Sequence, residues 1–356
     1  MRRLILSFHL AIALIAGAFI AFLGVTGSIL AFEPELDRIL HPGISYVEPA
    51  GRILSLDEIG AAVSRRYPDE AIVAYLPSLS AEFPTQVILS RGVISVDQYT
   101  GNILGVRTRG LTFLGRVRAL HVRLASGDMG RLIVRCAACA MLLSLFSGLY
   151  LWWPAKRMRI HRPWLSSAFW FDLHNAIGIF SLLPLLFLAG SGIVIGFEDQ
   201  VSSLLRRTAG SSAMPAKPAV RALPSEHSGI ELTPDQAVDI ARAQLPGTVA
   251  DRLQMPRFGG SYQVSLVNMH DLPLGTRNSV SLDPWSGQIL STTRASDVSL
   301  GERILAWNQA LHTGTAFGIS NRIIVAAAGM LVPVQIVSGF WIWLRRRKIT
   351  RSSRSE

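Results

Sequence analysis

The chain contains two internal repeats, and each carries a histidine beside a long apolar run. Residues 119–152 align without a gap on residues 310–343, and the segment that begins near residue 9 aligns on the one near residue 174. The matched histidines and glycines are His121/His312, His9/His174, Gly148/Gly339 and Gly27/Gly192. A duplication constrains architecture strongly, because equivalent segments of the two copies take equivalent places in the fold.

The composition indicates a membrane protein. Of 356 residues, 49% are hydrophobic and only 17% are charged, which favours membrane spans that alternate with soluble parts. The net charge of +11 could suit nucleic acid, but the cations flank apolar runs, where anionic lipid attracts them. We therefore expect membrane lipid as a partner and no nucleic acid. The two cysteines lie within an apolar run and exclude a disulfide framework.

The first apolar segment, residues 4–32, contains no charged residue. The apolar core of a signal peptide has only about 7–15 residues, so this segment is predicted to be a retained membrane span. Three more spans are predicted at residues 132–153, 169–198 and 323–344.

Basic residues predict the orientation of these spans. They lie at Arg2 and Arg3, in the loop Pro154–Pro163 and in the tail Arg345–Lys348. Short basic segments mark the cytoplasmic side, so we expect an inner-membrane protein with both termini in the cytoplasm. The two long hydrophilic segments are then periplasmic.

The hydrophilic segments resemble each other. A capping box is predicted at Ser55/Glu58, and Thr233-Pro234 opens a second helix with proline at its first position. Residues 97–104 then match residues 283–290, with Asp and Gly marking a tight turn between two strands. Each segment is predicted to form a small α+β module, and Thr208–Ser228 to form a loose linker.

This pattern resembles the PepSY-associated transmembrane family. The Asp-x-x-[Thr/Ser]-Gly-x-Ile-Leu turn after a helix is similar to a PepSY domain, and Leu-His motifs precede spans two and four. The resemblance implies an α-helical membrane fold with four transmembrane helices in two repeats and two periplasmic α+β PepSY-like modules. The expected division is 4–32 (span one), 34–118 (module one), 119–131 (interfacial segment), 132–153 (span two), 154–168 (cytoplasmic loop), 169–198 (span three), 199–306 (linker and module two), 307–322 (interfacial segment), 323–344 (span four) and 345–356 (tail).

The family includes iron-uptake proteins and di-haem ferric-siderophore reductases, so the resemblance implies two haem b groups and transmembrane electron transfer. Longer relatives look like fusions to a flavodoxin/ferredoxin-reductase module, and no dinucleotide-binding glycine motif is found here. We therefore expect an electron donor on the cytoplasmic side or in the membrane, and a ferric siderophore as substrate.

The four repeated histidines are the candidate axial ligands of haem iron. Neutral imidazole is a good ligand for haem iron, and an ionisable residue in or beside a span is costly without a partner. Equal offsets from equivalent glycines place His9 and His174 at one depth on the inner side, and His121 and His312 at one depth on the outer side. Two ligands at one depth suit a bis-histidine haem in a helical bundle, which gives one inner and one outer haem.

Some residues have a simpler interpretation beside the functional one. A single histidine at a span end is most often an interfacial polar residue, and Cys136 and Cys139 read as small packing residues. Glycines of the spans, such as Gly24 and Gly190, could serve close helix packing or admit a porphyrin. Outer arginines could pair with haem propionates, attract an anionic iron chelate or form a solvated charge belt. Arg131 and Arg322 coincide in the repeat and are the best candidates for propionates.

The function that these observations favour is an inner-membrane electron conduit that reduces a periplasmic ferric siderophore, and hence a haem-dependent oxidoreductase. A non-catalytic PepSY scaffold or protease regulator, a quinone-linked b-type cytochrome and a transporter remain alternatives. The other histidines, which have no repeat partner, read as surface residues: His41, His161, His227 and His270.

Overall fold

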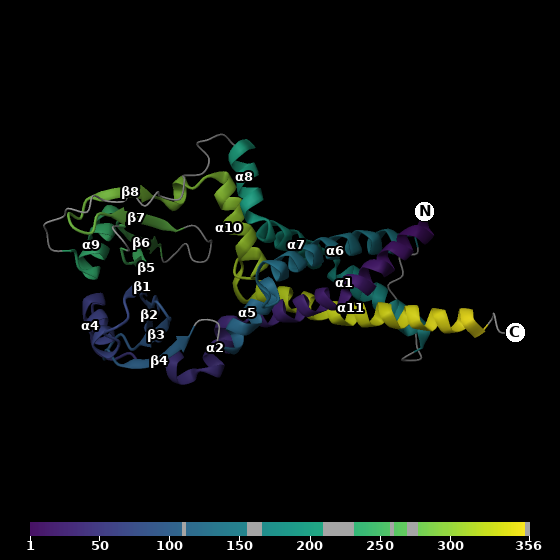
Figure 1. Cartoon of the computed structure of the whole chain (residues 1–356), viewed down its shortest axis with the longest axis horizontal. Coiled ribbons are helices and arrows are strands. Elements are labelled where there is room, and N and C mark those ends of the chain that lie inside the picture. The colour runs from purple at the N-terminus through teal and green to yellow at the C-terminus, as the bar shows by residue number, and fades with distance from the viewer. Residues whose placement is uncertain (109–111, 155–165, 209–230, 257–259, 269–276, 353–356) are drawn as a thin grey trace. The chain divides into compact units, whose positions relative to one another are not determined.

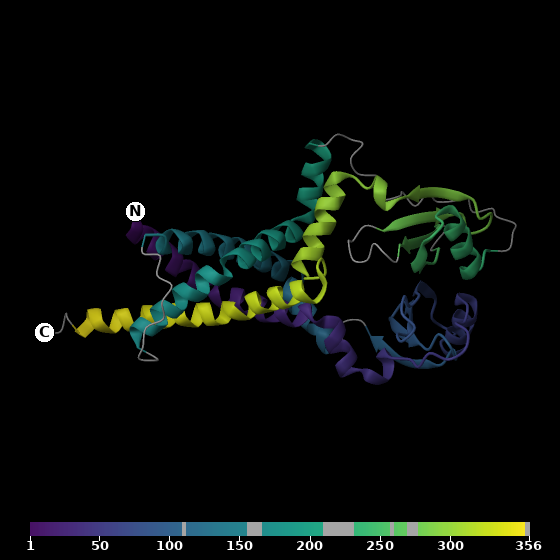
Figure 2. The same cartoon turned by 180° about the vertical axis from the view of Figure 1, so that it is seen from behind.

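The computed structural model describes residues 1–108, 112–154, 166–208, 231–256, 260–268 and 277–352. Several expectations fall outside these residues: the basic residues of the loop after span two, residues 209–228 of the linker, His161, His227 and His270. The described chain divides into two compact units, shown in Figures 1 and 2. The membrane unit comprises Met1–Glu33, Arg116–Ser203 and Trp307–Glu356, and the sheet unit comprises Pro34–Gly115 and Leu204–Ala306.

In the described part of the chain, four helices of the membrane unit are long and apolar enough to cross a membrane. They are α1 (Arg2–Ala31), α6 (Gly127–Trp152), α7 (Ser167–Gly196) and α11 (Gly318–Ser352). Helices α1 and α7 each contact both α6 and α11, so the equivalent helices of the two repeats lie diagonally across a four-helix bundle. The N-terminus and the last turn of α11 lie at the same end of this unit (Figure 1).

The bundle is tightly packed along α1 and α11. A Cβ added to Gly24 would lie 2.6 Å from the carbonyl oxygen of Gly329, so at Gly24 the packing interpretation of the span glycines holds. The hydroxyl of Ser28 also donates a hydrogen bond of 2.8 Å to the carbonyl of Ala326 on α11. An apolar layer of buried residues comes from all four helices, namely Ile20, Ala137, Leu185, Ala328 and Val332.

Spans two and four begin earlier than expected. Their helices start at Gly127 and Gly318, which have φ of +61° and +64°, a conformation that favours glycine. Each start follows a turn in which the amide of Ala125 or Ala316 donates 3.1 Å to the carbonyl of the residue six positions earlier. These turns end α5 (Phe113–Arg123) and α10 (Leu300–His312), so the expected interfacial segments are largely helical. Helix α7 ends at Gly196, and α8 (Glu198–Thr208) follows.

The sheet unit contains two copies of one pattern, a helix followed by a four-stranded meander. The first copy begins with α2 (Glu33–Leu40) and the short α3 (Pro42–Ser45) and then forms α4 (Leu56–Arg66), β1 (Ile72–Leu76), β2 (Thr85–Leu89), β3 (Gly92–Val96) and β4 (Ile103–Thr108). The second forms α9 (Pro234–Gln244), β5 (Val249–Gln254), β6 (Tyr262–Val267), β7 (Asn278–Leu282) and β8 (Ile289–Thr293), and the 3₁₀ turn Ala295–Asp297 follows. The predicted capping box at Ser55/Glu58 and the predicted helix start at Thr233-Pro234 are confirmed, and Thr233 forms a second capping box with Gln236.

The repeated Asp–Gly turns are also confirmed. Between β3 and β4 the amide of Gly101 donates 2.8 Å to the carbonyl of Asp97, and between β7 and β8 the amide of Gly287 donates 3.0 Å to that of Asp283. Both glycines have positive φ, +74° and +70°, which a residue with a Cβ rarely adopts.

The two expected modules form one antiparallel sheet with the order β4-β3-β2-β1-β5-β6-β7-β8. Strand β1 pairs with β5 through Ala74↔Gln254 and Tyr75↔Leu253, and buried residues of both copies share one core. A separate meander would leave β1 and β5 as open edges, and their pairing removes both. The two α+β segments expected from the sequence are therefore the two halves of one sheet.

Two carboxylates join the helix N-termini of the copies. The Oδ1 and Oδ2 atoms of Asp235 accept bonds of 3.0 and 2.8 Å from the amides of Leu56 and Asp57 on α4. In the opposite direction Asp57 accepts one longer bond of 3.4 Å from the amide of Asp235, because Pro234 has no N–H to supply a second. Burial raises the pKa of Asp57. The symmetric sequence positions thus carry unequal interactions.

We predict that Asp235→Ala destabilises the sheet unit more than Asp57→Ala. Loss of two charge-assisted hydrogen bonds should cost about 2 kcal/mol, whereas loss of the long bond and of the hydrogen bond between Asp57 and the Thr233 side chain should cost about 1 kcal/mol. Thermal unfolding of the purified protein measures both. Asp239→Ala, at an exposed position of α9, is the matched control. Equal losses for Asp57 and Asp235 would contradict the asymmetry.

Candidate functional site

The structure brings the repeated histidines together in two pairs. The ring centroids of His9 and His174 are 6.4 Å apart with an interplanar angle of 87°. Those of His121 and His312 are 6.5 Å apart with an angle of 46°. The pairs are those expected from the equal offsets in the repeat. On α1, His9 belongs to the inner pair and Thr26 contacts the outer pair. These two positions are separated along the helix by about 25 Å, since a helix rises about 1.5 Å per residue.

Each histidine ring lies against a glycine of a neighbouring helix. A Cβ added to that glycine would lie between 3.0 and 3.3 Å from the Cε1 atom of the ring, which is tighter than ordinary contact. The four glycine–histidine contacts are Gly148 with His9, Gly339 with His174, Gly27 with His121 and Gly192 with His312. These are the same four glycines that keep equal offsets in the sequence repeat. Absence of a side chain lets the ring approach the helix backbone.

A hydroxyl from the residue that precedes each glycine contacts Nδ1 of the same ring. We call the Ser-Gly or Thr-Gly pair with its histidine a cradle. The Oγ–Nδ1 distances are 2.9 Å for Ser147–His9, 3.0 Å for Ser338–His174, 3.0 Å for Thr26–His121 and 2.8 Å for Ser191–His312. The same cradle therefore occurs four times, twice in each half of the duplication.

The cradles determine which ring nitrogen carries the proton. Each hydroxyl donates its own hydrogen to a carbonyl three or four residues earlier on its helix, as Ser147 does to Leu143 at 2.8 Å. Its oxygen is then available to accept from Nδ1–H. For His174 a second contact supports a proton on Nδ1, because Nδ1 also lies 3.1 Å from the carbonyl oxygen of Gln335, which can only accept a hydrogen bond. Nε2 is left with a free lone pair, the form that binds a metal.

The spacing of each pair fits one metal ion between two imidazoles. A metal–imidazole bond is about 2.0–2.1 Å, and an imidazole atom lies about 1.1 Å from its ring centre, so two rings on opposite sides of one ion have centroids about 6.3 Å apart. The observed 6.4 and 6.5 Å agree with this value. Within the described residues no cluster of three or more His, Cys, Asp and Glu side chains suits a metal ion. Two histidines are enough for haem, whose porphyrin supplies the other four nitrogens.

The outer pair is held in its neutral form. Burial lowers the pKa of His121 to about 4, and it lowers the pKa of His312 as well. Both rings are therefore uncharged at pH 7, which keeps Nε2 able to bind a metal ion.

The outer arginines are placed unequally. Arg131 and Arg322 lie in the first turns of α6 and α11, and the Cα of Arg322 lies 2.9 Å from where a Cβ of Gly314 would be. Arg135 lies one turn further into α6, with its guanidinium 4.9 Å from the ring of Phe197. Its Cγ lies 3.1 Å from where a Cβ of Gly196 would be, one turn from the Gly192 that holds His312. Among the described residues, none accepts a hydrogen bond from the buried Nε of Arg135.

A model of the family described as "PepSY-associated TM region" matches residues 6–346. The chain belongs to the PepSY-associated TM family. The match covers nearly the whole chain and agrees with four candidate membrane spans, so this is a membrane protein. Comparison with curated proteins returned no match.

The sequence predicted the paired histidines and their equivalent glycines, but it did not predict that four hydroxyl groups contact the rings. A signal was present, because each of the four glycines follows a Ser or Thr. Ser147 and Ser338 are identical in the repeat and were matched. Thr26 was not matched, because it aligns with Ser191 and not with another threonine. Among the outer arginines, the sequence favoured Arg131 and Arg322 over Arg135, because the equivalent of Arg135 in the second repeat is Ala326.

We predict that Gly192→Leu displaces the ring of His312 and destabilises the bundle, whereas Gly190→Leu is tolerated. A side chain at Gly192 would overlap the ring at a cost of about 1–3 kcal/mol, but a Cβ added to Gly190 meets no atom within 4 Å. Thermal unfolding in detergent and the ¹⁵N signals of labelled histidine provide the measurement. The two positions lie on one helix, so similar losses at both would show that the His312 contact is unimportant.

Proposed function

We propose that this protein is an inner-membrane di-haem oxidoreductase that reduces a ferric siderophore in the periplasm. The observation that carries the proposal is the centroid spacing of 6.4 and 6.5 Å in two pairs of repeat-equivalent histidines, each ring with Nδ1 against a hydroxyl. When bound, haem b would supply the reversible one-electron chemistry of its iron.

The residues of this chain would fix the ligands and their orientation. A histidine that donates Nδ1–H to an oxygen is held in one ring orientation and becomes a more basic ligand at Nε2. Each hydroxyl is itself anchored by a bond to its own helix, such as that of Thr26 to the carbonyl of Phe22 at 2.8 Å. Each ligand would therefore meet the iron with little reorganisation, which favours electron transfer.

The direction of electron flow follows from the charges at one end of the membrane unit. Arg2 and Arg3 begin α1, and Arg345–Arg347 lie near the end of α11, at the same end of the unit as the N-terminus (Figure 1). The positive-inside rule places this end in the cytoplasm. His9 and His174 would then serve the cytoplasmic side, where a cytoplasmic or membrane donor delivers electrons, and His121 and His312 the periplasmic side.

The outer arginines support an anionic substrate or anionic groups of the cofactor. Arg118 pairs with Glu33, but Arg135 brings a half-buried guanidinium close to the His312 cradle. A propionate or the carboxylate of a chelate would complete the hydrogen bonding of Arg135. Reduction of the ferric ion by one electron weakens its bonds to hard oxygen ligands, so the siderophore would release ferrous iron.

We predict that each histidine variant loses the haem of its own pair. Substitution of either residue in a pair by alanine should reduce the haem content from about two per chain to about one, because one iron takes two axial ligands. The pyridine haemochrome assay and the Soret spectrum measure this. Variants of His9 and His174 should share one residual spectrum, and variants of His121 and His312 should share another.

The matched control is His41→Ala, since His41 lies in the sheet unit and contacts Asp37 at 3.1 Å. It should retain both haems. Colourless protein from haem-replete cells would favour the scaffold or protease-regulator alternative. Reduced protein that is reoxidised by a quinone but not by ferric chelates would favour a quinone-linked cytochrome.

We predict that Arg135→Gln lowers the reduction potential of the outer haem, whereas Arg135→Lys retains it. A nearby positive charge disfavours the ferric state, and its removal should shift the potential by about 50 mV. Potentiometric titration followed by absorption spectroscopy measures this. Arg123→Gln, which removes an exposed charge from α5, should have little effect because solvent screens it. Equal shifts for both would remove Arg135 from the site.

A further inference from the structure

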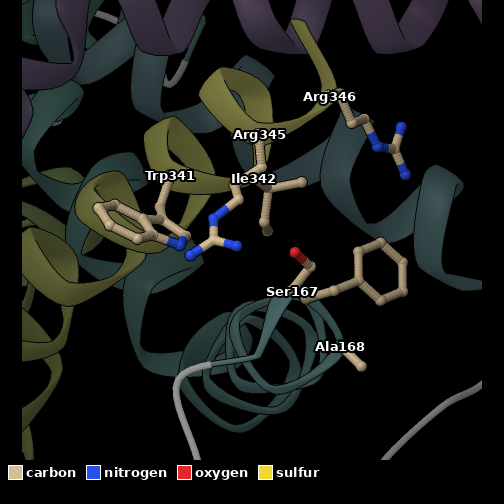
Figure 3. A pocket seen from close by; sticks show the side chains of 7 residues that line it. Ser167, Ala168, Trp341, Ile342, Arg345 and Arg346 are labelled. Carbon is tan, nitrogen blue, oxygen red and sulfur yellow. The ribbon is translucent and has the colours of Figure 1, made fainter. Parts of the chain in front are cut away.

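A pocket separate from the histidine cradles lies between α7 and α11 at the basic end of the membrane unit (Figure 3). Its volume is about 400 Å³, within the range of small-molecule sites. One wall is the first turn of α7, with Ser167 and Ala168, and the other is a late turn of α11, with Arg345 and Arg346. Figure 3 shows these two walls facing each other.

The polar groups of the pocket favour an anion. Two arginines line it, and none of the described residues that line it is acidic. The guanidinium of Arg345 lies 5.3 Å from the ring centre of Trp341, a cation–π contact that holds it beside the pocket. The hydroxyl of Ser167 and the backbone amides of the first turn of α7 add hydrogen-bond donors and a positive helix end. Arginine recognises phosphate oxygens through paired N–H donors.

The remaining walls are apolar. Phe171 lies one turn into α7, and Trp341 and Ile342 lie one turn before the arginines of α11. The span of α7 starts at Ser167 and that of α11 ends at Arg347, so the pocket is at the level where lipid head groups meet hydrocarbon. Trp341 also contacts Trp170 at 5.9 Å, an aromatic pair typical of this interface. The pocket is thus cationic toward the aqueous side and apolar toward the lipid.

This chemistry matches a phospholipid better than a quinol. Oxidation of a quinol requires a group that accepts its protons, and the described residues that line the pocket include arginines and a serine but neither a carboxylate nor a histidine. A free phosphate would leave the apolar walls without a partner. A phosphodiester with acyl chains satisfies both the guanidinium groups and the apolar walls.

We propose that this pocket binds the phosphate of an anionic membrane phospholipid, with Arg345 and Arg346 as its ligands and Phe171, Trp341 and Ile342 against the glycerol and upper acyl chain. The site is independent of haem binding. Basic pockets between membrane helices on the cytoplasmic side are a general means of lipid recognition. Removal of both arginines should lower the affinity about 30-fold, since each contributes about fivefold near an anionic head group.

Native mass spectrometry tests the proposal on the full-length protein in mixed micelles of phosphatidylglycerol and phosphatidylcholine. We expect a retained phosphatidylglycerol adduct that R345Q/R346Q loses. The double variant R3Q/R347Q removes the same number of charges without touching the pocket, since Arg347 lies over Trp343 instead, 4.5 Å from its ring centre. It should keep the adduct. Ala168→Leu, which fills the pocket and leaves every charge in place, should lose it.

Size-exclusion chromatography shows whether each variant is folded, and Ala168→Leu keeps the test decisive if R345Q/R346Q fails to fold. Four outcomes would overturn the proposal. These are equal loss in R3Q/R347Q, equal retention of phosphatidylcholine, displacement of the lipid by excess inorganic phosphate, and displacement by a soluble quinol. The last two would assign the pocket to a free anion or to an electron donor.

Discussion

An imidazole among membrane helices needs a hydrogen-bond partner, and the membrane unit supplies one to Nδ1 in the same way four times. A glycine lets the ring approach the backbone, and the preceding hydroxyl accepts from Nδ1 while donating to its own helix. Nδ1 is thus satisfied within the protein, and the proposed haem iron would bind Nε2. Helices α1 and α7 each contribute a histidine at one depth and the Thr-Gly or Ser-Gly pair of a cradle at the other.

This arrangement explains why the duplication matters for function. Equivalent helices lie diagonally across the bundle, so His9 on α1 and His174 on α7 approach each other across it. A two-fold relation of this kind would give the proposed haem iron two matching ligands from a single sequence signal. The apolar layer formed by Ile20, Leu185 and their neighbours then separates the two pairs and limits water between them. Histidine pairs at two depths would suit the proposed transfer of electrons across the membrane.

The sheet unit uses the same duplication differently. Its two meanders meet edge to edge through β1 and β5, and the carboxylate of Asp235 spans the gap between the helix N-termini. Proline at position 234 makes this contact one-sided. Duplicated elements therefore do not remain equivalent once they share an interface, because a single missing N–H changes which copy supplies the hydrogen bonds.

The sequence alone determined the elements and their register. Long uncharged runs give spans, the capping boxes start α4 and α9, and Asp97 and Asp283 with their glycines form the hairpin turns, because each of these rules is local. The gapless repeat also predicted which histidines pair. Only the tertiary structure decided what surrounds them. That β1 pairs with β5, that Thr26 and Ser191 hold rings from distant helices, and that Arg135 reaches α7 all depend on side chains far apart in the chain, whose contacts follow from packing and leave no local pattern.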